Sequence, residues 1–490
     1  MEKGSILGYL EQKTILVTGA TGYLGKLFVE KVLRVQPDVK RLYLVVRAAD
    51  AESAAKRLQS EVLGKDLFRV LREKYRDEFD SFISSKVIPI AGDVAAENLG
   101  IEGSSLREAL WREIDVLVHS AATTRFDERY DLSLSINTLG AKHVVEFSKK
   151  CLKLQILLHV STAFVAGEKA GVIFEKPFGM GEALSGLSLV NIEEECMLVK
   201  HTLKELRAAK STNMDERKAM RKLGMERATA FGWPNTYVFT KAMGEMLIGY
   251  LKENLPLAIV RPTMISSTIK EPFPGWIEGC RTFDSLILAY AKGHLSSYMV
   301  NLKAAMDVVP GDMVINAIIA IMVHQLNQRY EFIYHVASSS RNPMNYAMLE
   351  DFVYHYFLAN PQRMKDGRLI QAHKVTFYNS RAKFYWNVRL PYKILFKVLH
   401  LANVISSHLF GGQYVNLNRK YEYMMKMVDL YEPYAFFKGI FNVQNSERVR
   451  KAMVEGCNDG KMFDFDVDSI NWEEYFRNMH IPGLLKYEIK

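Results

Sequence analysis

Long hydrophobic runs are missing from this sequence. No stretch reaches the roughly 18 uninterrupted apolar residues expected of a membrane-spanning helix. The N-terminal residues lack both the apolar segment of a secretory signal and the Ser- and Arg-rich composition of a transit peptide, so neither is predicted. Internal repeats and low-complexity tracts are missing as well, which argues against a repeat architecture.

Cysteine is scarce. The 490 residues include four widely spaced cysteines, none of which form a C-x-x-C pair: Cys151, Cys196, Cys280 and Cys457. This spacing argues against a disulfide framework and against a zinc site, so no metal is predicted. The chain is expected to be reduced and intracellular.

Apolar and basic residues are abundant. Hydrophobic residues make up 49% of the chain and aromatic residues 11%, which is enough for a large packed core, and the length predicts two domains. The net charge of +9 suggests an anionic partner, such as a phosphate-rich cofactor, nucleic acid or anionic lipid. No recognised RNA- or DNA-binding motif accompanies this charge, so nucleic-acid binding is not predicted.

A glycine-rich turn lies between an apolar strand and an apolar-periodic helix near the N-terminus. Residues 14–17 predict the strand, residues 26–33 predict the helix, and the glycines between them follow a G-x-x-G-x-x-G spacing. Such a turn binds the pyrophosphate of a dinucleotide, because glycine lets the backbone approach the phosphates and the helix N-terminus presents free N–H groups. The spacing resembles that of the extended short-chain dehydrogenase/reductase superfamily. The residues expected to bind the cofactor here are Thr18, Gly19, Thr21, Gly22, Tyr23, Leu24 and Gly25.

Apolar runs alternate with helical patterns over the first third of the chain, which indicates a parallel sheet with crossover helices. We predict an α/β fold: a doubly wound parallel (Rossmann) sheet, with a helical insertion at about 168–232 and a smaller, mainly helical C-terminal domain. The boundary is placed near residue 360, where the composition turns basic, so the domains are 11–360 and 361–490. The expected strands cover residues 14–18, 41–46, 86–91, 115–119, 154–160 and 257–260.

The residue after the second predicted strand bears on the choice of nicotinamide cofactor. Sites that prefer NAD place an acid near this point for the ribose hydroxyls, whereas this chain has Arg47, a fixed cation suited to a 2′-phosphate. NADPH is therefore predicted, with Asp50, slightly further on, as the residue that argues against it. Further cofactor contacts are expected from residues after the third and fourth strands: Asp93, Ala121, Ala122 and Asn137.

A Y-x-x-x-K motif supplies the candidate catalytic pair, Tyr237 and Lys241. On a helix, residues four apart share a face, so the phenol and the ammonium are expected in one site, where the cation would lower the pKa of the phenol. The spacing occurs twice more, but only this pair falls between the fifth and sixth predicted strands. The other two pairs are interpreted as chance matches: Tyr9/Lys13 and Tyr434/Lys438.

Two adjacent hydroxyl groups follow the fifth predicted strand. A hydroxyl at this position can donate a hydrogen bond to a substrate carbonyl oxygen as negative charge builds there. Thr162 is the favoured candidate, and Ser161 is the alternative.

Three further blocks resemble plant alcohol-forming fatty acyl-CoA reductases, and the basic tail resembles their C-terminal male sterility domain. The blocks are residues 121–129, 232–237 and 261–279. The resemblance implies that a long-chain acyl-CoA is reduced to a primary alcohol by two hydride transfers from NADPH, through an aldehyde. It also implies that Tyr237 and Thr162 bind the carbonyl oxygen and that Lys241 orients the nicotinamide ribose. One departure is His119, where related sequences often carry an asparagine.

Other activities stay open at this stage. An NAD(P)-dependent nucleotide-sugar epimerase or dehydratase would share the glycine motif and the Tyr/Lys pair, although it would not explain the insertion or the basic tail. A reductase could also stop at the aldehyde, and an acyl carrier protein could replace CoA as the acyl donor.

The segment 361–420 is strongly basic. It contains eleven Lys and Arg residues and a single acid, Asp366, with aromatic and leucine residues between them. Such a basic amphipathic segment can lie on a membrane surface, and a solvated basic face over an ordinary core is the alternative. We predict peripheral attachment to the cytosolic face of the endoplasmic reticulum, or a cytoplasmic location.

Overall fold

A seven-stranded parallel sheet forms the centre of the molecule. The computed structural model describes residues 4–186, 189–327, 332–363, 367–405 and 411–489, so Asp366 of the basic segment lies outside it. The strand order is β11-β7-β5-β4-β1-β2-β3, and all neighbouring strands run parallel. The strands are β1 (Thr14–Thr18), β2 (Arg41–Val46), β3 (Val87–Ala91), β4 (Val116–His119), β5 (Ile156–Val160), β7 (Leu257–Pro262) and β11 (Ile333–Val336).

This sheet confirms the predicted doubly wound fold. The chain leaves β1 toward β2 and β3 and then returns to β4 on the other side, so the strand order reverses between β1 and β4. A ligand crevice is expected outside the carboxyl ends of the strands at such a reversal. Strand β11 was not predicted, because its four buried residues are too few to show a periodic pattern.

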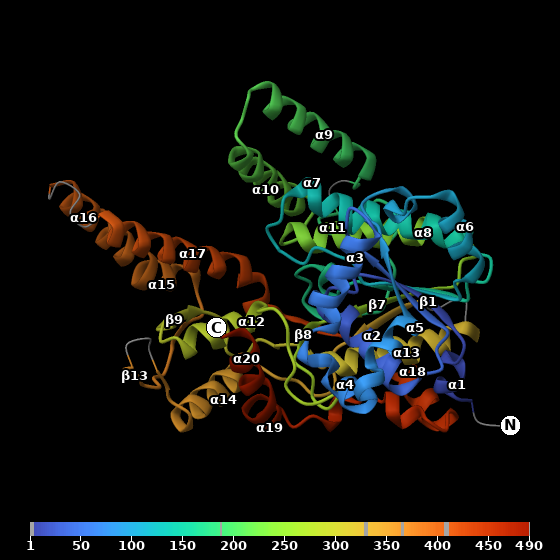
Figure 1. Cartoon of the computed structure of the whole chain (residues 1–490). Coiled ribbons are helices and arrows are strands. Elements are labelled where there is room, and N and C mark those ends of the chain that lie inside the picture. The colour runs from blue at the N-terminus through green and yellow to red at the C-terminus, as the bar shows by residue number, and fades with distance from the viewer. Residues whose placement is uncertain (1–3, 187–188, 328–331, 364–366, 406–410, 490) are drawn as a thin grey trace.

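Helices cover both faces of the sheet (Figure 1). One face carries α2 (Tyr23–Val35) and α13 (Gly311–His324), which contact each other, and the other carries α8 (Gly140–Lys150) and α11 (Thr236–Leu251). Helix α13 is apolar almost throughout and buried along most of its length, since it lies between the sheet and the C-terminal segment.

The predicted insertion forms a helical hairpin at the top of Figure 1. Helix α9 (Ile192–Ala208) begins at an Asn191 cap, and α10 (Asn213–Ala230) begins at a Thr212/Asp215 capping box. The buried carboxylate of Glu195 on α9 pairs with Arg227 on α10 and accepts a 2.6 Å hydrogen bond from Tyr130. This group ties the hairpin to the body of the protein.

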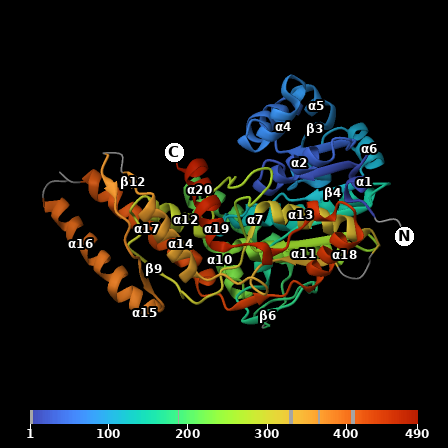
Figure 2. The ribbon, with the colours of Figure 1, turned by 90° about the horizontal axis from the view of Figure 1, so that it is seen from below.

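The C-terminal region first projects as an arm and then returns to the body (Figures 1 and 2). The arm comprises residues 381–405 and 411–435, with α15 (Arg381–Phe384), a π-helical turn (Tyr385–Arg389), α16 (Leu390–Ile405) and α17 (Gly411–Ala435). The chain then pairs β15 (Gly439–Phe441) with β6 (Gly171–Ile173), and α18 (Gln444–Gly456) packs against α13. The predicted domain boundary near residue 360 stays a prediction.

Shorter elements complete the fold. The remaining helices are α1 (Ile6–Leu10), α3 (Ala51–Leu58), α4 (Arg69–Tyr75), α5 (Phe79–Lys86), α6 (Ser104–Glu113), α7 (Tyr130–Ser133), α12 (Thr282–Ala291), α14 (Tyr346–Ala359), α19 (Trp472–Tyr475) and α20 (Ile481–Glu488). The remaining strands are β8 (Met264–Ser266), β9 (Ser297–Met299), β10 (Val308–Pro310), β12 (Gln362–Arg363), β13 (Leu369–Ile370) and β14 (Thr376–Tyr378).

Candidate active site

Two glycines of the turn, Gly19 and Gly25, leave no room for a side chain. Gly19 has φ +78°, and a Cβ there would lie 2.5 Å from the backbone nitrogen of Ala121. A Cβ on Gly25 would lie 2.3 Å from the carbonyl oxygen of Gly19. Gly22 is the N-terminal cap of α2 and lines the adjoining cleft. The turn therefore brings the free N–H groups at the start of α2 to the cleft, where they suit a pyrophosphate.

A cleft of about 480 Å³, which we call the dinucleotide cleft, lies at the carboxyl ends of β1, β2, β3 and β4. Seven of the residues expected to bind the cofactor line it: Gly19, Thr21, Gly22, Arg47, Asp93, Ala121 and Ala122. The other six are not among its lining residues: Thr18, Tyr23, Leu24, Gly25, Asn137 and Lys241.

Two of these six residues hold the loop that follows β4. The Asn137 amide accepts a 3.0 Å hydrogen bond from the Thr123 N–H and donates to the Thr123 carbonyl at 3.1 Å. Thr18 Oγ1 lies 2.7 Å from Nδ1 of His119. Burial lowers the pKa of His119 to about 3, so this residue is neutral and joins the ends of β1 and β4.

Two arginines line the cleft beyond the end of β2. Arg47 follows β2 as predicted. The Arg57 guanidinium, which no sequence motif indicated, donates a hydrogen bond to the Arg47 carbonyl. Asp50 instead caps α3, accepting a 2.7 Å hydrogen bond from the Ser53 N–H. The acid that argued against NADPH is therefore engaged in a helix cap, and two cations line the cleft beside it.

A second cavity, of about 380 Å³, brings Tyr237 and Thr162 together. We call it the catalytic cavity; Thr124 and Arg125 line both it and the dinucleotide cleft, so the two spaces adjoin. Ser161 does not line it, and its buried Oγ makes no hydrogen bond. Of the two candidate hydroxyls, only Thr162 faces this space.

The Lys241 ammonium is buried next to the carboxyl end of β5. The Lys241 ammonium donates to the Val160 carbonyl at 2.8 Å and lies 3.1 Å from Nε2 of His159. Burial lowers the pKa of Lys241 to about 8, against the opposing charge of Glu245. His159 accepts from the ammonium, and burial together with this cation holds the pKa of His159 well below its usual value.

The cation that acts on the phenol is Arg281. Burial raises the pKa of Tyr237 to about 12, and the Arg281 guanidinium, which lines the same cavity, lowers it. We expected Lys241 to lower this pKa, but the charge that lowers it is that of Arg281, which belongs to no motif recognised in the sequence. Arg281 immediately precedes α12, and only the tertiary structure brings it into the same cavity as Tyr237.

Helix α17 closes one side of the catalytic cavity with aromatic side chains. Tyr434 accepts a 2.9 Å hydrogen bond from Asn235, and its ring stacks on Phe126 with centroids 4.9 Å apart. Its Y-x-x-x-K spacing was interpreted as chance, and Lys438 is exposed, yet Tyr434 itself lines the site. Tyr431 and Leu430 extend the same wall.

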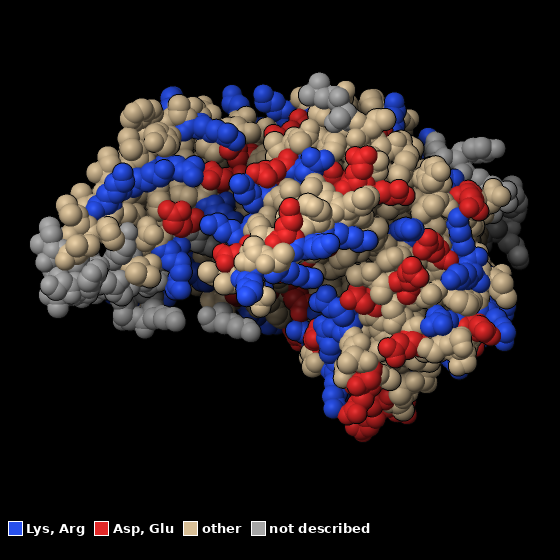
Figure 3. All heavy atoms as spheres, turned by 90° about the horizontal axis from the view of Figure 1, so that it is seen from above, with Lys and Arg blue, Asp and Glu red and all other residues tan. Residues whose placement is uncertain are grey.

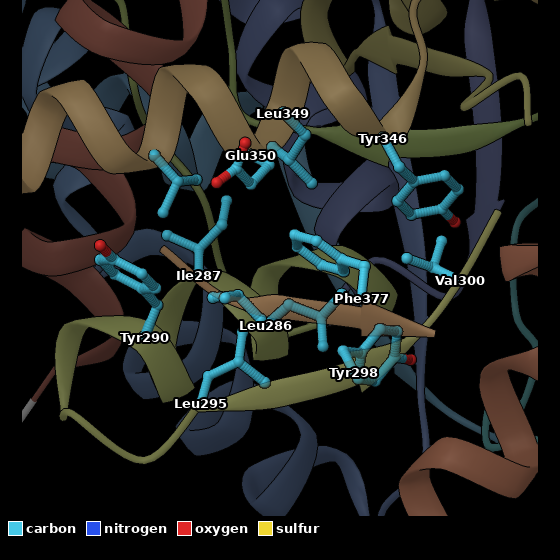
Figure 4. Close-up of a pocket in the computed structure, with 12 residues that line it drawn as sticks. Leu286, Ile287, Tyr290, Leu295, Tyr298, Val300, Tyr346, Leu349, Glu350 and Phe377 are labelled. Atoms are coloured by element: carbon cyan, nitrogen blue, oxygen red, sulfur yellow. The ribbon is translucent and has the colours of Figure 1, made fainter. Parts of the chain in front are cut away.

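A third, narrow cavity of about 40 Å³ lies between α12 and α14 (Figure 4). Its lining is almost entirely aliphatic and aromatic, and Figure 4 shows Leu349, Phe377 and Ile287 converging on it. Tyr346 lines this cavity and donates a 3.4 Å hydrogen bond to the Tyr434 carbonyl. A hydrogen bond thus joins a residue that lines this apolar cavity, Tyr346, to one that lines the catalytic cavity, Tyr434.

Two other kinds of site are not found in the described part of the chain. No three His, Cys, Asp or Glu side chains gather there as a metal site. Among the same residues, no helix has the length and apolar character needed to span a membrane.

Comparison with known proteins agrees with this geometry. Two family models, both described as male sterility protein, match residues 17–318 and 395–490. The chain is 48% identical to the alcohol-forming fatty acyl-CoA reductase of Simmondsia chinensis, over 99% of both chains. It belongs to the fatty acyl-CoA reductase family. A member of this family is an oxidoreductase with an NAD(P)-binding domain, so a nucleotide-sugar epimerase is not favoured.

Other relatives extend the comparison. The probable fatty acyl-CoA reductase 4 of Arabidopsis thaliana is 49% identical over 98% of both chains. Among solved structures, the terminal R domain of the myxalamid PKS-NRPS pathway aligns with a TM-score of 0.53 at 16% identity, covering 97% of this reductase and 91% of that chain. At that identity the likeness concerns the fold alone.

Proposed function

We propose that this reductase converts a long-chain acyl-CoA to a primary alcohol with NADPH, through an aldehyde. The observation that carries the proposal is the catalytic cavity, where Thr162 and Tyr237 share one space beside the dinucleotide cleft. Family membership supports the acyl-CoA substrate, since the named relatives are fatty acyl-CoA reductases.

The residues of the cleft fit a nicotinamide dinucleotide phosphate. The glycine turn and the N-terminus of α2 would hold the pyrophosphate, and Arg47 with Arg57 would hold the 2′-phosphate. When bound, the reduced nicotinamide supplies the hydride. A comparison of kcat/KM for NADPH and NADH tests this preference, and equal values would overturn it.

The protein's own groups act on the substrate oxygen. The hydroxyls of Thr162 and Tyr237 would donate hydrogen bonds to the thioester carbonyl, stabilising the oxyanion until the CoA thiolate leaves. In the second step Tyr237, which burial keeps protonated, would give its proton to the alkoxide formed from the aldehyde. Lys241, fixed by Val160 and His159, would orient the ribose next to the phenol.

We assign the far end of the acyl chain to the apolar cavity of Figure 4. Its lining suits methylene groups, and its Tyr346 is bonded to Tyr434 of the catalytic cavity. An acyl chain with its carbonyl at Tyr237 would then run past α17 toward α14.

The arm supports the proposal of a peripheral membrane protein on the cytosolic face of the endoplasmic reticulum. Large apolar side chains of this arm are exposed rather than packed on a core, including Trp386 (66% exposed) and Val398 (58%). Lys393 and Lys397 lie among them and are also exposed. This combination suits an anionic membrane surface better than a solvated basic face.

Product analysis tests the proposed reaction. The purified full chain is incubated with palmitoyl-CoA and NADPH, and hexadecanol is expected with two NADPH consumed for each alcohol. Accumulation of hexadecanal as the final product would mean a reductase that stops at the aldehyde. Absence of both products would overturn the proposal.

A further inference from the structure

A fourth cleft, of about 540 Å³, lies between helix α10 of the insertion and the C-terminal arm. We call it the basic cleft, because six cations line it against three carboxylates. The cations are Arg217, Lys218, Arg221, Lys222, Arg389 and Lys426; the carboxylates are Asp127, Glu422 and Asp429. Figure 3 views this side of the molecule and shows lysine and arginine side chains across it, with acidic side chains between them.

Part of this positive charge is not neutralised within the described chain. Asp127 pairs with Lys426 and lies 4.0 Å from Arg221, and Asp429 lies 3.1 Å from Arg389. Arg217 and Lys218 have no ion pair among the described residues. Arg221 Nε is buried there without a hydrogen-bond partner.

The cations on α10 are compensated only in part by acids of the chain: Lys222 lies 3.7 Å from Glu226, and Arg221 lies 4.0 Å from Asp127. Arg217 and Arg221 are four residues apart, as are Lys218 and Lys222, so like charges lie over one another on successive turns. Such pairs destabilise a helix, whereas an anion between them would form charge-assisted hydrogen bonds with both. The pattern therefore points to a polyanionic ligand.

The basic cleft adjoins the catalytic cavity. Asp127, Lys426 and Leu430 line both spaces. A molecule that reacts at Tyr237 can therefore extend between α10 and α17 without leaving the protein surface. The catalytic end of this path is aromatic and the outer end is basic, so its occupant should carry its phosphates far from its reacting carbon.

We propose that the basic cleft binds the 3′-phospho-ADP portion of CoA, with the pantetheine arm passing Asp127, Lys426 and Leu430 to the thioester. This inference rests on the proposed function and names the part of the substrate that α10 recognises. Three phosphate groups match the surplus of cations, and guanidinium groups suit phosphate oxygens. Methionines in the same cleft, Met214 and Met225 among them, offer adaptable apolar surface for the adenine.

A kinetic comparison of two substrates tests the subsite. The double variant Arg217→Ala/Lys218→Ala removes two exposed side chains and should fold normally. Its KM for palmitoyl-CoA should rise about tenfold or more, while kcat stays unchanged. Its KM for S-palmitoyl pantetheine, which lacks the nucleotide, should not change. Lys200→Ala/Lys204→Ala on α9 is the matched control, with the same loss of charge outside the cleft, and should leave both KM values unchanged.

A binding measurement keeps the subsite separate from the reaction. Calorimetric titration of 3′,5′-ADP into the full chain, with NADP⁺ saturating the dinucleotide cleft, should detect binding that the Arg217/Lys218 variant loses and the α9 control keeps. Equal binding to all three proteins, or an equal rise of KM for both substrates, would overturn the inference. Failure of the proposed function would appear instead as a wild-type protein that forms neither aldehyde nor alcohol.

Discussion

At the scale of single residues, the partly buried phenol of Tyr237 and the fully buried ammonium of Lys241 respond to burial in opposite directions. Burial raises the pKa of Tyr237 to about 12 and lowers that of Lys241 to about 8, because each neutral form is favoured away from water. The phenol therefore keeps its proton at neutral pH, as a proton donor must, and the lysine is the group that titrates within an accessible range.

Replacing Tyr237 with Phe tests the proton donor. The variant removes one hydroxyl, and kcat/KM for alcohol formation should fall by about 10²- to 10⁴-fold, the usual contribution of a positioned general acid. NADPH affinity, measured by fluorescence titration, should stay close to wild type.

Tyr434→Phe provides the matched control, since it removes a hydroxyl from the same cavity that is bonded to Asn235. Its activity should remain within a few-fold of wild type. Comparable losses in both variants would contradict a special role for Tyr237, and so would hexadecanal reduction that survives the Tyr237 change.

The lowered pKa of Lys241 predicts how the rate of the reaction depends on pH. A lysine is charged below its pKa, so the ammonium that would hold the ribose is present below about pH 8 and is lost above it. The profile of kcat/KM should therefore fall on its basic side with an apparent pKa near 8. NADPH dissociation constants measured over the same range show whether the loss arises in binding. A rate that stays constant up to pH 9.5 would refute this assignment.

At the scale of elements, helix α14 presents one face to the apolar cavity and another to solvent. Leu349 lines the cavity, whereas Leu358 on the same helix is exposed. The cavity is narrow, so added volume on its inner face should shorten the acyl chain that fits.

Leu349→Phe should shift the chain-length preference toward shorter substrates. Each methylene excluded from an apolar site costs about 0.8 kcal/mol, so displacing two should lower the kcat/KM ratio of long to short acyl-CoA by about tenfold. Competition assays with mixed acyl-CoAs and analysis of the alcohols measure this ratio. Leu358→Phe, the control, should leave it unchanged, and an unaltered ratio in the Leu349 variant would remove the apolar cavity from the acyl path.

At the scale of the whole molecule, the C-terminal region has two parts with different surroundings. Its last segment packs on the body of the protein. There the Tyr475 hydroxyl donates a hydrogen bond to Ser266 on β8, and His480 lies 3.0 Å from Asp284 on α12. Both β8 and α12 also contribute residues to the catalytic cavity. Its arm projects away from the sheet with apolar side chains exposed (Figure 1). One region thus supports the site and presents the surface that we assign to a membrane.

The double variant Trp386→Glu/Val398→Glu tests that surface. Wild-type protein should sediment with vesicles of phosphatidylcholine and phosphatidylserine, and the variant should remain largely in the supernatant, because two charges on the arm oppose burial in the lipid interface. Leu152→Glu is the control, since Leu152 is 77% exposed on the body rather than on the arm. Equal sedimentation of the variant and the wild type would contradict attachment through the arm.

Much of the fold could be predicted because its signals are local. Six of the seven central strands were predicted within two residues of their observed bounds. The structure has Arg47 after β2, and Tyr237 and Lys241 on α11, as predicted, while the roles of these residues stay predictions. Strand β11 was missed because it is short. The Asn137 amide holds the loop beside the cleft, and its predicted contact with the cofactor stays a prediction.

The sequence alone determined most of the sheet, the dinucleotide turn and the helix that carries the Tyr237/Lys241 motif, because backbone geometry and periodic burial act between residues close together in the chain. Only the tertiary structure decided which side chains from distant parts of the chain lie together at the site. Arg57 joins Arg47 in the dinucleotide cleft, and Arg281 and Tyr434 join Tyr237 and Thr162 in the catalytic cavity. These neighbours act through space, over distances set by how helices pack on the sheet, and no spacing in the sequence records such a contact.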